Sequence, residues 1–131
     1  MKKLICLLAI CWTVTAFGQK DSSAPKPKYE MKQYWFVMLS KGKDRDKITD
    51  TAILNKLQAG HMANMQVMAD AGKLMVAGPF GDDGNWRGIF IFDCASKEEV
   101  EALLKTDPAI SAGRLDYEIH PWWTAKGTVF K

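Results

Sequence analysis

The sequence predicts an α+β fold of the ferredoxin-like class, with its elements in the order βαββαβ. Short runs of aromatic and aliphatic residues indicate four strands, at 34–39, 74–77, 88–92 and 115–120. Two segments with helical spacing of apolar residues lie after the first strand and after the third. This order is the split βαβ motif, in which right-handed crossovers place two helices on one face of a four-stranded antiparallel sheet.

The first strand is followed by the longer of the two predicted helices. Gly42 and the charged residues after it end the strand. Thr49 or Asp50 is the expected N-cap of the helix, because their side-chain oxygens accept free N–H groups of a first turn. The helix runs to about Ala71, where Gly72 terminates it.

The second half of the domain contains a hairpin, a second helix and a last strand. The second and third strands form the hairpin, whose loop at 81–87 is longer than the tightest turns. A capping box, Ser96 with Glu99 three residues later, starts the second helix, which ends near Thr106. A turn and one irregular helical turn at 107–113 lead to the last strand, where apolar and polar residues alternate.

The predicted sheet is apolar on both faces. In the first and third strands, both sets of alternating side chains are apolar: Tyr34, Phe36 and Met38 against Trp35, Val37 and Leu39, and Ile89 and Ile91 against Phe90 and Phe92. Two helices cover one face only, so the other face needs a cover. A second copy of the sheet, packed at about 10 Å, is the simplest one and predicts a homodimer. The alternative is that residues 122–131 fold back, although this segment is rather polar.

Residues 1–18 have the pattern of a secretory signal peptide. Two lysines precede a short apolar core at 4–14, and a small-x-small site precedes Gln19. Cleavage there predicts an exported protein, periplasmic or secreted, without an integral membrane segment. An uncleaved anchor is the weaker alternative, since a spanning helix needs about 20 apolar residues. Lipid attachment at Cys11 is disfavoured by the bulky Ile10 before it.

A linker, one domain and a short tail are expected after the signal peptide. Residues 19–32 are rich in Lys, Ser and Pro, which is typical of a flexible linker. The segment 33–124 has the length of one small domain, and 125–131 form a C-terminal tail. Cleavage leaves Cys94 as the single cysteine, so no internal disulfide is expected and the fold depends on its core or on oligomerisation.

Charge and motif spacing exclude several classes of partner. Loss of the two N-terminal lysines reduces the 18 basic residues to 16, against 15 acidic residues, and the lysines are scattered among acids. Nucleic-acid binding is therefore unsupported. Glycines 78, 81 and 84 match no nucleotide-binding pattern. His61 and His120 are too few for a zinc site, so neither a cofactor nor a metal is expected.

His61 interrupts the apolar stripe of the first predicted helix. Residues four apart lie on one side of a helix, so the stripe comprises the line Ile53, Leu57, His61, Met65 and Ala69, widened by Leu54, Met62 and Met68. An imidazole on this face is either a core residue satisfied by a hydrogen bond or a catalytic group with a polar partner. Gly60 beside it suggests close packing of the helix, although simple tolerance of a glycine that costs roughly 0.5–1 kcal/mol is the alternative.

Five short motifs follow one another along the chain: Ala59-Gly60-His61-Met62, Gly72-Lys73-Leu74, Ala77-Gly78-Pro79, Thr106-Asp107-Pro108 and Ala112-Gly113. In this order and spacing, from about Gln33 to Trp123, the chain resembles the YCII-related proteins. The resemblance implies a ferredoxin-like protomer that dimerises as an α/β barrel, with His61 and Asp107 as an active-site pair. Some members resemble muconolactone isomerases in fold, one branch dehydrochlorinates a hydroxylated aromatic, and most have no assigned reaction.

A pair formed by His61 and Asp107 would suit proton transfer near neutral pH. The carboxylate fixes the imidazole tautomer and stabilises the imidazolium. Isomerisation or elimination by proton abstraction then needs only an apolar pocket, for which Phe80, Trp86 and Phe90 are available. The alternative for Asp107 is a structural turn ahead of Pro108.

Gly78, Pro79 and Phe80 are the candidate ligand-binding residues, because glycine lets backbone amides approach a ligand, although a strand-ending turn explains them equally well. Three functions remain open. The first is a cofactor-free lyase or isomerase acting on a small aromatic or cyclic molecule, with His61 as base and Asp107 as its orienting partner. The second is a noncatalytic module that binds a small molecule in the same pocket. The third is a structural dimer with His61 as a core residue.

Overall fold

In the computed structural model, residues 28–129 of the chain are described. The elements are β1 (Met31–Lys41), the 3-10 helix η1 (Arg45–Lys47), α1 (Thr51–Asp70), β2 (Leu74–Pro79), β3 (Trp86–Phe92), α2 (Lys97–Leu104), α3 (Pro108–Ser111) and β4 (Leu115–Ala125). The predicted order βαββαβ is confirmed; α3 lies where one irregular helical turn is expected, and η1 is an additional short helix. The expected signal peptide at 1–18 and the linker as far as residue 27 lie outside the described residues.

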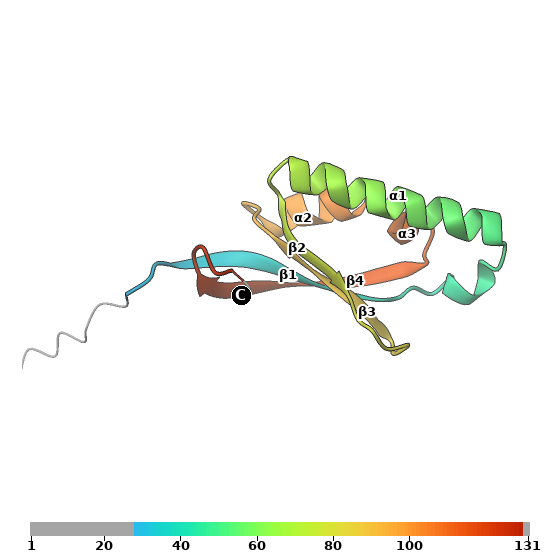
Figure 1. The fold of residues 1–131 in the computed structure, drawn as a ribbon, viewed down its shortest axis with the longest axis horizontal. Helices are drawn as coiled ribbons and strands as arrows, with labels where there is room; N and C mark the ends of the chain where they lie inside the picture. The colour runs from blue at the N-terminus through green and yellow to red at the C-terminus, as the bar shows by residue number, and fades with distance from the viewer. Residues whose placement is uncertain (1–27, 130–131) are drawn as a thin grey trace, which may run out of the picture.

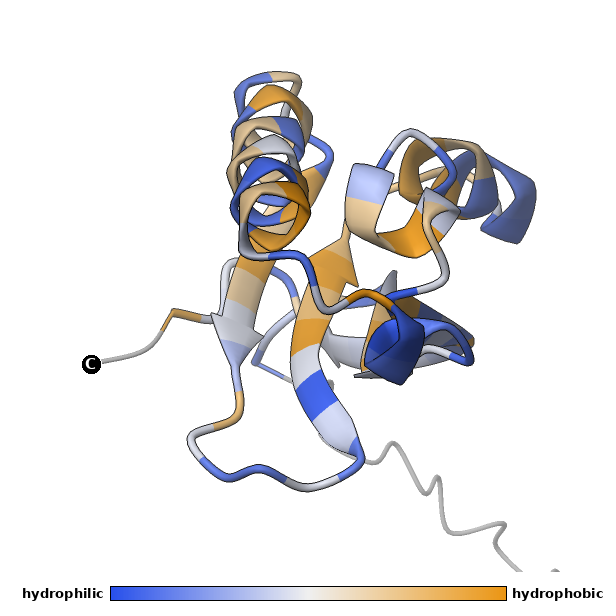
Figure 2. Ribbon diagram, turned by 90° about the vertical axis from the view of Figure 1, so that its right-hand side faces the viewer, coloured by the Kyte–Doolittle hydropathy of each residue, from blue (hydrophilic) through white to orange (hydrophobic). Residues whose placement is uncertain are grey.

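The four strands form one antiparallel sheet in the order β2-β3-β1-β4. The helices α1, α2 and α3 lie over the same face of this sheet (Figure 1). Seen from the side, α1 lies next to the pair α2 and α3, and the strands run beneath both (Figure 2). Within residues 28–129, no helix is long and apolar enough to cross a membrane.

The bounds of β1 and β4 differ from the prediction. β1 begins at Met31, in the segment expected as linker, and β4 continues through Pro121 to Ala125. The two strands pair along their whole length, so each supplies the hydrogen-bond partners that extend the other. Because β4 is an edge strand, it accommodates a proline that would interrupt a central strand. Pro121 therefore does not end the strand.

Local capping signals define the helices as predicted. The Asp50 side chain accepts two N–H groups of the first turn of α1. The Ser96 hydroxyl accepts the N–H of Glu99, whose carboxylate in turn accepts the N–H of Ala95. Gly72 has a φ of +69°, which ends α1 at little steric cost.

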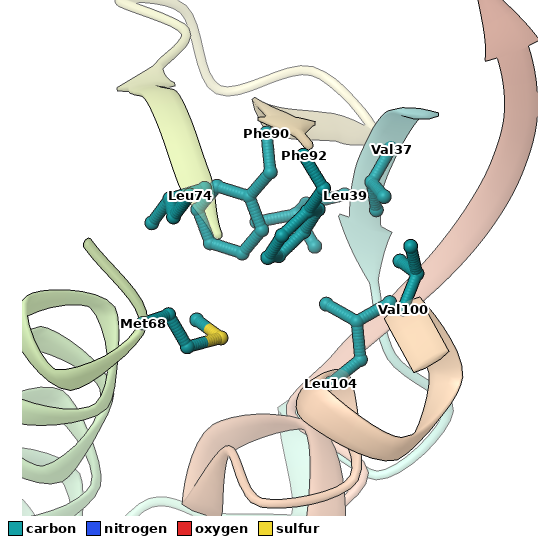
Figure 3. Packing of buried hydrophobic residues seen from close by; sticks show 8 residues of the cluster. All are labelled: Val37, Leu39, Met68, Leu74, Phe90, Phe92, Val100 and Leu104. Carbon is teal, nitrogen blue, oxygen red and sulfur yellow. The ribbon is translucent and has the colours of Figure 1, made fainter. Parts of the chain in front are cut away.

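The hydrophobic core lies between the helices and one face of the sheet (Figure 3). Its buried members are Val37, Leu39, Met68, Leu74, Phe90, Phe92, Val100 and Leu104. The rings of Phe90 and Phe92 meet edge to face, with centroids 5.8 Å apart. Full burial of one such side chain stabilises the fold by about 1.5–3 kcal/mol. The strands are apolar where they pass beneath the helices and become polar toward the loop between β2 and β3 (Figure 2).

The buried stripe of α1 differs from the predicted line of residues. Ile53 is 51% exposed, whereas Met68, which lay beside the predicted line, is 2% exposed. Ala69, at the other end of that line, is also exposed. A step of four residues turns by roughly 40° more than a full helical turn, so a line of five such residues winds around the helix. Only its middle, including His61, faces the sheet.

The opposite face of the sheet carries a second set of apolar side chains, termed here the open face. The strand register and the alternation of side chains place on it Tyr34, Phe36, Met38, Ile89, Ile91 and Trp122. In the described part of the chain no helix lies over this face (Figure 1). The prediction that one face of the sheet stays without a helical cover is thus confirmed.

Candidate functional site

His61 and Asp107 meet between α1 and the start of α3. Nδ1 of His61 lies 2.5 Å from Oδ2 of Asp107, as in a short, charge-assisted hydrogen bond. The Asp107 side chain is fully buried, and that of His61 is 12% exposed. The two residues are 46 positions apart in the sequence, so only the packing of the two helices brings them together. The contact that the family resemblance implied is present.

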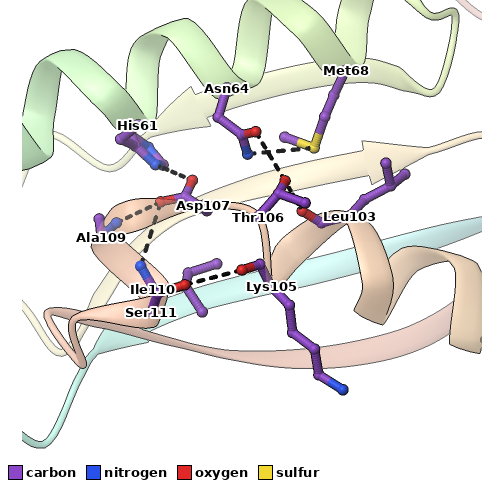
Figure 4. A network of polar contacts seen from close by, with 10 residues as sticks. All are labelled: His61, Asn64, Met68, Leu103, Lys105, Thr106, Asp107, Ala109, Ile110 and Ser111. Carbon is purple, nitrogen blue, oxygen red and sulfur yellow. Dashed lines mark hydrogen bonds and ion pairs between the residues drawn. The ribbon is translucent and has the colours of Figure 1, made fainter.

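The two carboxylate oxygens of Asp107 have different partners. Oδ1 accepts the N–H groups of Ala109 at 2.8 Å and Ile110 at 3.4 Å, so Asp107 is the N-cap of α3. Oδ2 points toward His61 on the neighbouring helix (Figure 4). The structural interpretation of Asp107 therefore holds, and the same carboxylate also contacts His61. The cap fixes the orientation of the carboxylate that the histidine meets.

The surroundings of His61 define which of its ring nitrogens is available. A carboxylate can only accept a hydrogen bond, so Nδ1 donates to Asp107 and Nε2 is the unprotonated nitrogen of the neutral ring. Within residues 28–129, no hydrogen-bond partner is found for Nε2. The Phe90 ring stacks against the imidazole, with centroids 6.0 Å apart and planes inclined by 25°. The ring is thus held by one hydrogen bond and one stacking contact.

Gly60 permits the close approach of α1 and α3. A Cβ at this position would lie 2.6 Å from Cγ of Pro108, the residue directly after Asp107. Such a distance is well inside van der Waals contact, and the proline ring has little freedom to move away. Of the two interpretations of Gly60, the structure supports close packing beside His61.

Gly60→Ala is expected to lower the free energy of unfolding by about 1–2 kcal/mol in urea denaturation. Overpacking costs about 1–3 kcal/mol, which outweighs the roughly 0.5–1 kcal/mol that alanine gains in a helix. Ala63→Gly, at an exposed position of the same helix, measures the propensity difference alone. A Gly60→Ala protein more stable than the wild type would contradict the close packing.

A cavity of about 360 Å³ lies beside His61. Its lining includes His61 and Gln58 of α1 and a largely apolar set: Leu39, Met62, Met65, Ala77, Phe90, Ala109 and Leu115. This volume falls within the range of about 300–1,000 Å³ typical of small-molecule sites. Because the buried Asp107 occupies Nδ1, Nε2 is the ring nitrogen left to contact a molecule in the cavity.

Two of the three predicted ligand-binding residues line this cavity. Gly78 and Pro79, at the end of β2, are part of its wall. Phe80 is not; its side chain is 37% exposed, and its N–H donates to the carbonyl of Arg87. Alternation along the chain turns Phe80 away from the face on which Pro79 lies. Of the three predicted aromatic residues only Phe90 lines the cavity. Trp86, like Phe80, lies outside the lining and is 60% exposed.

Three arginines line the same cavity and were not among the predicted site residues. They are Arg45, Arg87 and Arg114, and they are the only arginines in the sequence. Each stands near the end of a strand or in a connection, and Arg45 lies within the charged run 43–47, which by itself indicates only the end of the first strand. One signal could have found them: these three positions carry arginine, whereas every other Lys/Arg position of the chain is lysine.

A second polar contact joins α1 to the segment before α3. The Thr106 hydroxyl lies 2.9 Å from Oδ1 of Asn64 and 2.6 Å from the carbonyl of Leu103 (Figure 4). Asn64 lies one helical turn after His61, on the same side of α1. No local pattern in the sequence indicates this contact, which ties α1 to the residue directly before Asp107.

The remaining chemically reactive residues lie apart from the cavity. Burial raises the pKa of the Cys94 thiol, aided by the nearby carboxylate of Glu99. His120 is on the open face, with Nε2 3.5 Å from a carboxylate oxygen of Glu118. Among residues 28–129, no three His, Cys, Asp or Glu side chains are grouped so that they could hold a metal ion.

Comparisons with known proteins agree with this fold. The model of the YCII-related domain family matches residues 34–123. A similar solved structure is that of 5-chloro-2-hydroxyhydroquinone dehydrochlorinase from Burkholderia phenoliruptrix in complex with 2,5-dihydroxybenzoquinone. It has 20% sequence identity and a TM-score of 0.50, and the match covers 67% of this chain and 92% of that one. No curated protein sequence matches the chain. Since the family model spans well over half of the sequence, the chain belongs to the YCII-related domain family.

Proposed function

We propose that the protein is a cofactor-free lyase or isomerase that acts on a small aromatic or cyclic molecule, with His61 as general base. The observation that carries this proposal is the hydrogen bond from Nδ1 of His61 to the buried Asp107. It sets the tautomer whose Nε2 is a base and holds the ring beside a cavity of small-molecule size.

The proposed reaction begins when Nε2 removes a proton from an acidic C–H or O–H group of the bound molecule. The electron pair left behind either expels a leaving group as its anion, which is elimination, or is protonated at another carbon, which is isomerisation. The imidazolium formed in between is stabilised by the carboxylate of Asp107, which remains ionised. No step requires a nucleophilic side chain.

The structural neighbour supports this class of reaction. Its name describes a dehydrochlorinase of a hydroxylated, chlorinated aromatic ring, and loss of HCl is an elimination. The stacking of Phe90 on His61 and the apolar lining of the cavity favour a flat or cyclic ligand here. The predicted signal peptide supports an exported protein, periplasmic or secreted, and the open face supports a homodimer.

His61→Gln is expected to lower kcat by at least about 10³-fold, because it removes the base. The assay follows chloride release from 5-chloro-2-hydroxyhydroquinone and, for a panel of cyclic ketones and ring acids, exchange of ligand C–H for deuterium in D₂O by NMR. His120→Gln, the same change at the second histidine, which does not line the cavity, serves as the control and is expected to keep full activity.

Other outcomes would each contradict the proposal in a different way. Binding of panel molecules without turnover or exchange would identify a noncatalytic binding module. Equal behaviour of wild type and His61→Gln in binding, turnover and stability would identify a structural dimer in which His61 is a core residue.

A further inference from the structure

The three arginines of the chain approach the cavity from three separate segments at one end of the sheet. Arg45 lies in η1 after β1, Arg87 lies near the start of β3, and Arg114 directly precedes β4. The antiparallel register brings these segments together, because the end of β1 pairs with the start of β3 and with the start of β4. All three arginines are among the residues that line the cavity beside His61.

Backbone contacts hold two of these segments against each other. The N–H of Gly42 donates to the carbonyl of Arg114 at 3.0 Å, and the N–H of Asp44 donates to the carbonyl of Gly113 at 3.0 Å. A Cβ on Gly42 would collide with the Gly113 carbonyl, and Gly113 itself has a φ of +69°. The positions of Arg45 and Arg114 thus follow from a closely packed backbone.

The arginine charges are incompletely matched by carboxylates. Within residues 28–129, neither Arg45 nor Arg114 forms an ion pair. Arg87 contacts the exposed carboxylate of Asp83 at 3.3 Å. Burial lowers the pKa of Arg45, and the charges of Arg114 and Arg87 lower it further, against the opposing effect of Asp83 and Asp46. An anion placed among the arginines would relieve this repulsion.

We propose that these arginines bind the carboxylate of the ligand, so that the cavity takes a small organic acid whose apolar ring lies against Phe90 and Met65. A guanidinium presents parallel N–H donors that match both oxygens of a carboxylate. The apolar part of the lining, which lies beside His61, fits the body of such a molecule.

This inference rests on the proposed function, because one cavity contains both His61 and the arginines. A carboxylate held at the arginine end restricts how the ring lies against His61. Interactions with a group that does not react can in this way place the reacting C–H near the base. The arginines are therefore positioning residues, and their effect is expected in binding.

The test uses three pairs of acid and amide that differ in charge but hardly in shape: benzoate and benzamide, cinnamate and cinnamamide, and cyclohexanecarboxylate and its amide. Affinities are measured by ligand-observed NMR and calorimetry at constant ionic strength. At least one acid is expected to bind about tenfold or more tightly than its own amide. Arg45→Gln and Arg114→Gln are each expected to remove about tenfold of the acid affinity and little of the amide affinity.

Lys43→Gln is the matched control, because it removes one positive charge from an exposed residue two positions from Arg45 that does not line the cavity. This substitution is expected to change the affinity for the acids by less than about threefold. The proposal is overturned if no acid binds more tightly than its amide, or if Lys43→Gln weakens acid binding as much as Arg45→Gln does.

His61→Gln separates this inference from the proposed function. It removes the base but leaves the arginines, so preference for the acids is expected to persist. Acid binding without deuterium exchange or elimination in the wild type would contradict base catalysis alone. Turnover of neutral molecules without any acid preference would contradict the arginine site alone.

Discussion

Asp107→Asn is expected to lower kcat by about 10³–10⁴-fold while the fold persists, as the equivalent change does in Ser-His-Asp enzymes. Asparagine retains an oxygen for the N–H groups of Ala109 and Ile110, so α3 keeps its cap. Its amide group then faces His61 as a donor, and Nδ1 must accept the hydrogen bond. The ring proton moves to Nε2, which can no longer act as a base.

The measurement combines turnover with the ¹⁵N chemical shifts of the His61 ring, which distinguish the two tautomers. Wild type is expected to carry its proton on Nδ1 and Asp107→Asn to carry it on Nε2. Asp107→Ala is the structural control: losing the cap costs about 1 kcal/mol and losing a charged hydrogen bond about 1.5–3 kcal/mol, so stability falls by about 2–4 kcal/mol. An unchanged tautomer and kcat in Asp107→Asn would contradict the role given to Asp107.

Ile89→Glu is expected to dissociate the proposed homodimer, with Kd raised by at least about 10³-fold. Ile89 lies on the open face between Met38 of β1 and Gly78 of β2, where no basic partner stands opposite it in the register. A two-fold interface contains the substitution twice. Burying an unpaired carboxylate costs several kcal/mol in each copy, and about 4 kcal/mol in total already corresponds to a 10³-fold change in Kd.

Sedimentation equilibrium over a wide protein concentration range measures this effect. Val67→Glu is the matched control, because Val67 is 64% exposed on α1 and the change introduces the same charge away from the open face. It is expected to remain dimeric. A wild-type protein that is monomeric at all concentrations, or an Ile89→Glu protein that stays dimeric, would show that the open face is not the interface.

Much of the fold is readable from the sequence because its signals are local. The runs of aromatic and aliphatic residues give the four strands, and the side chains of Asp50 and Ser96 cap the helices within three residues of their own positions. Their order then permits few topologies. The strand ends depend on neighbours elsewhere in the chain and were predicted less well: the last strand was expected to stop at residue 120, but β1 pairs with β4 as far as Ala125.

Only one of the two residues of the candidate site could be predicted from local sequence signals. The histidine in the apolar stripe of α1 marked one partner, and the family motifs supplied the other. No property of Asp107 in its own segment distinguishes a cap from a partner of His61, since the same carboxylate makes both contacts. The distinction depends on the distance between α1 and α3, which Gly60 sets through its contact with Pro108.

The sequence by itself therefore determined the strands, the helices, their order, the apolar faces of the sheet and the place of His61 within an apolar stripe, because periodicity and capping act over a few residues. The tertiary structure alone decided that Asp107 faces His61, that Phe80 lies outside the cavity, and that Arg45, Arg87 and Arg114 share it. These arginines come from three connections distant in sequence, and only the pairing of β1 with both β3 and β4 brings them to one end of the sheet.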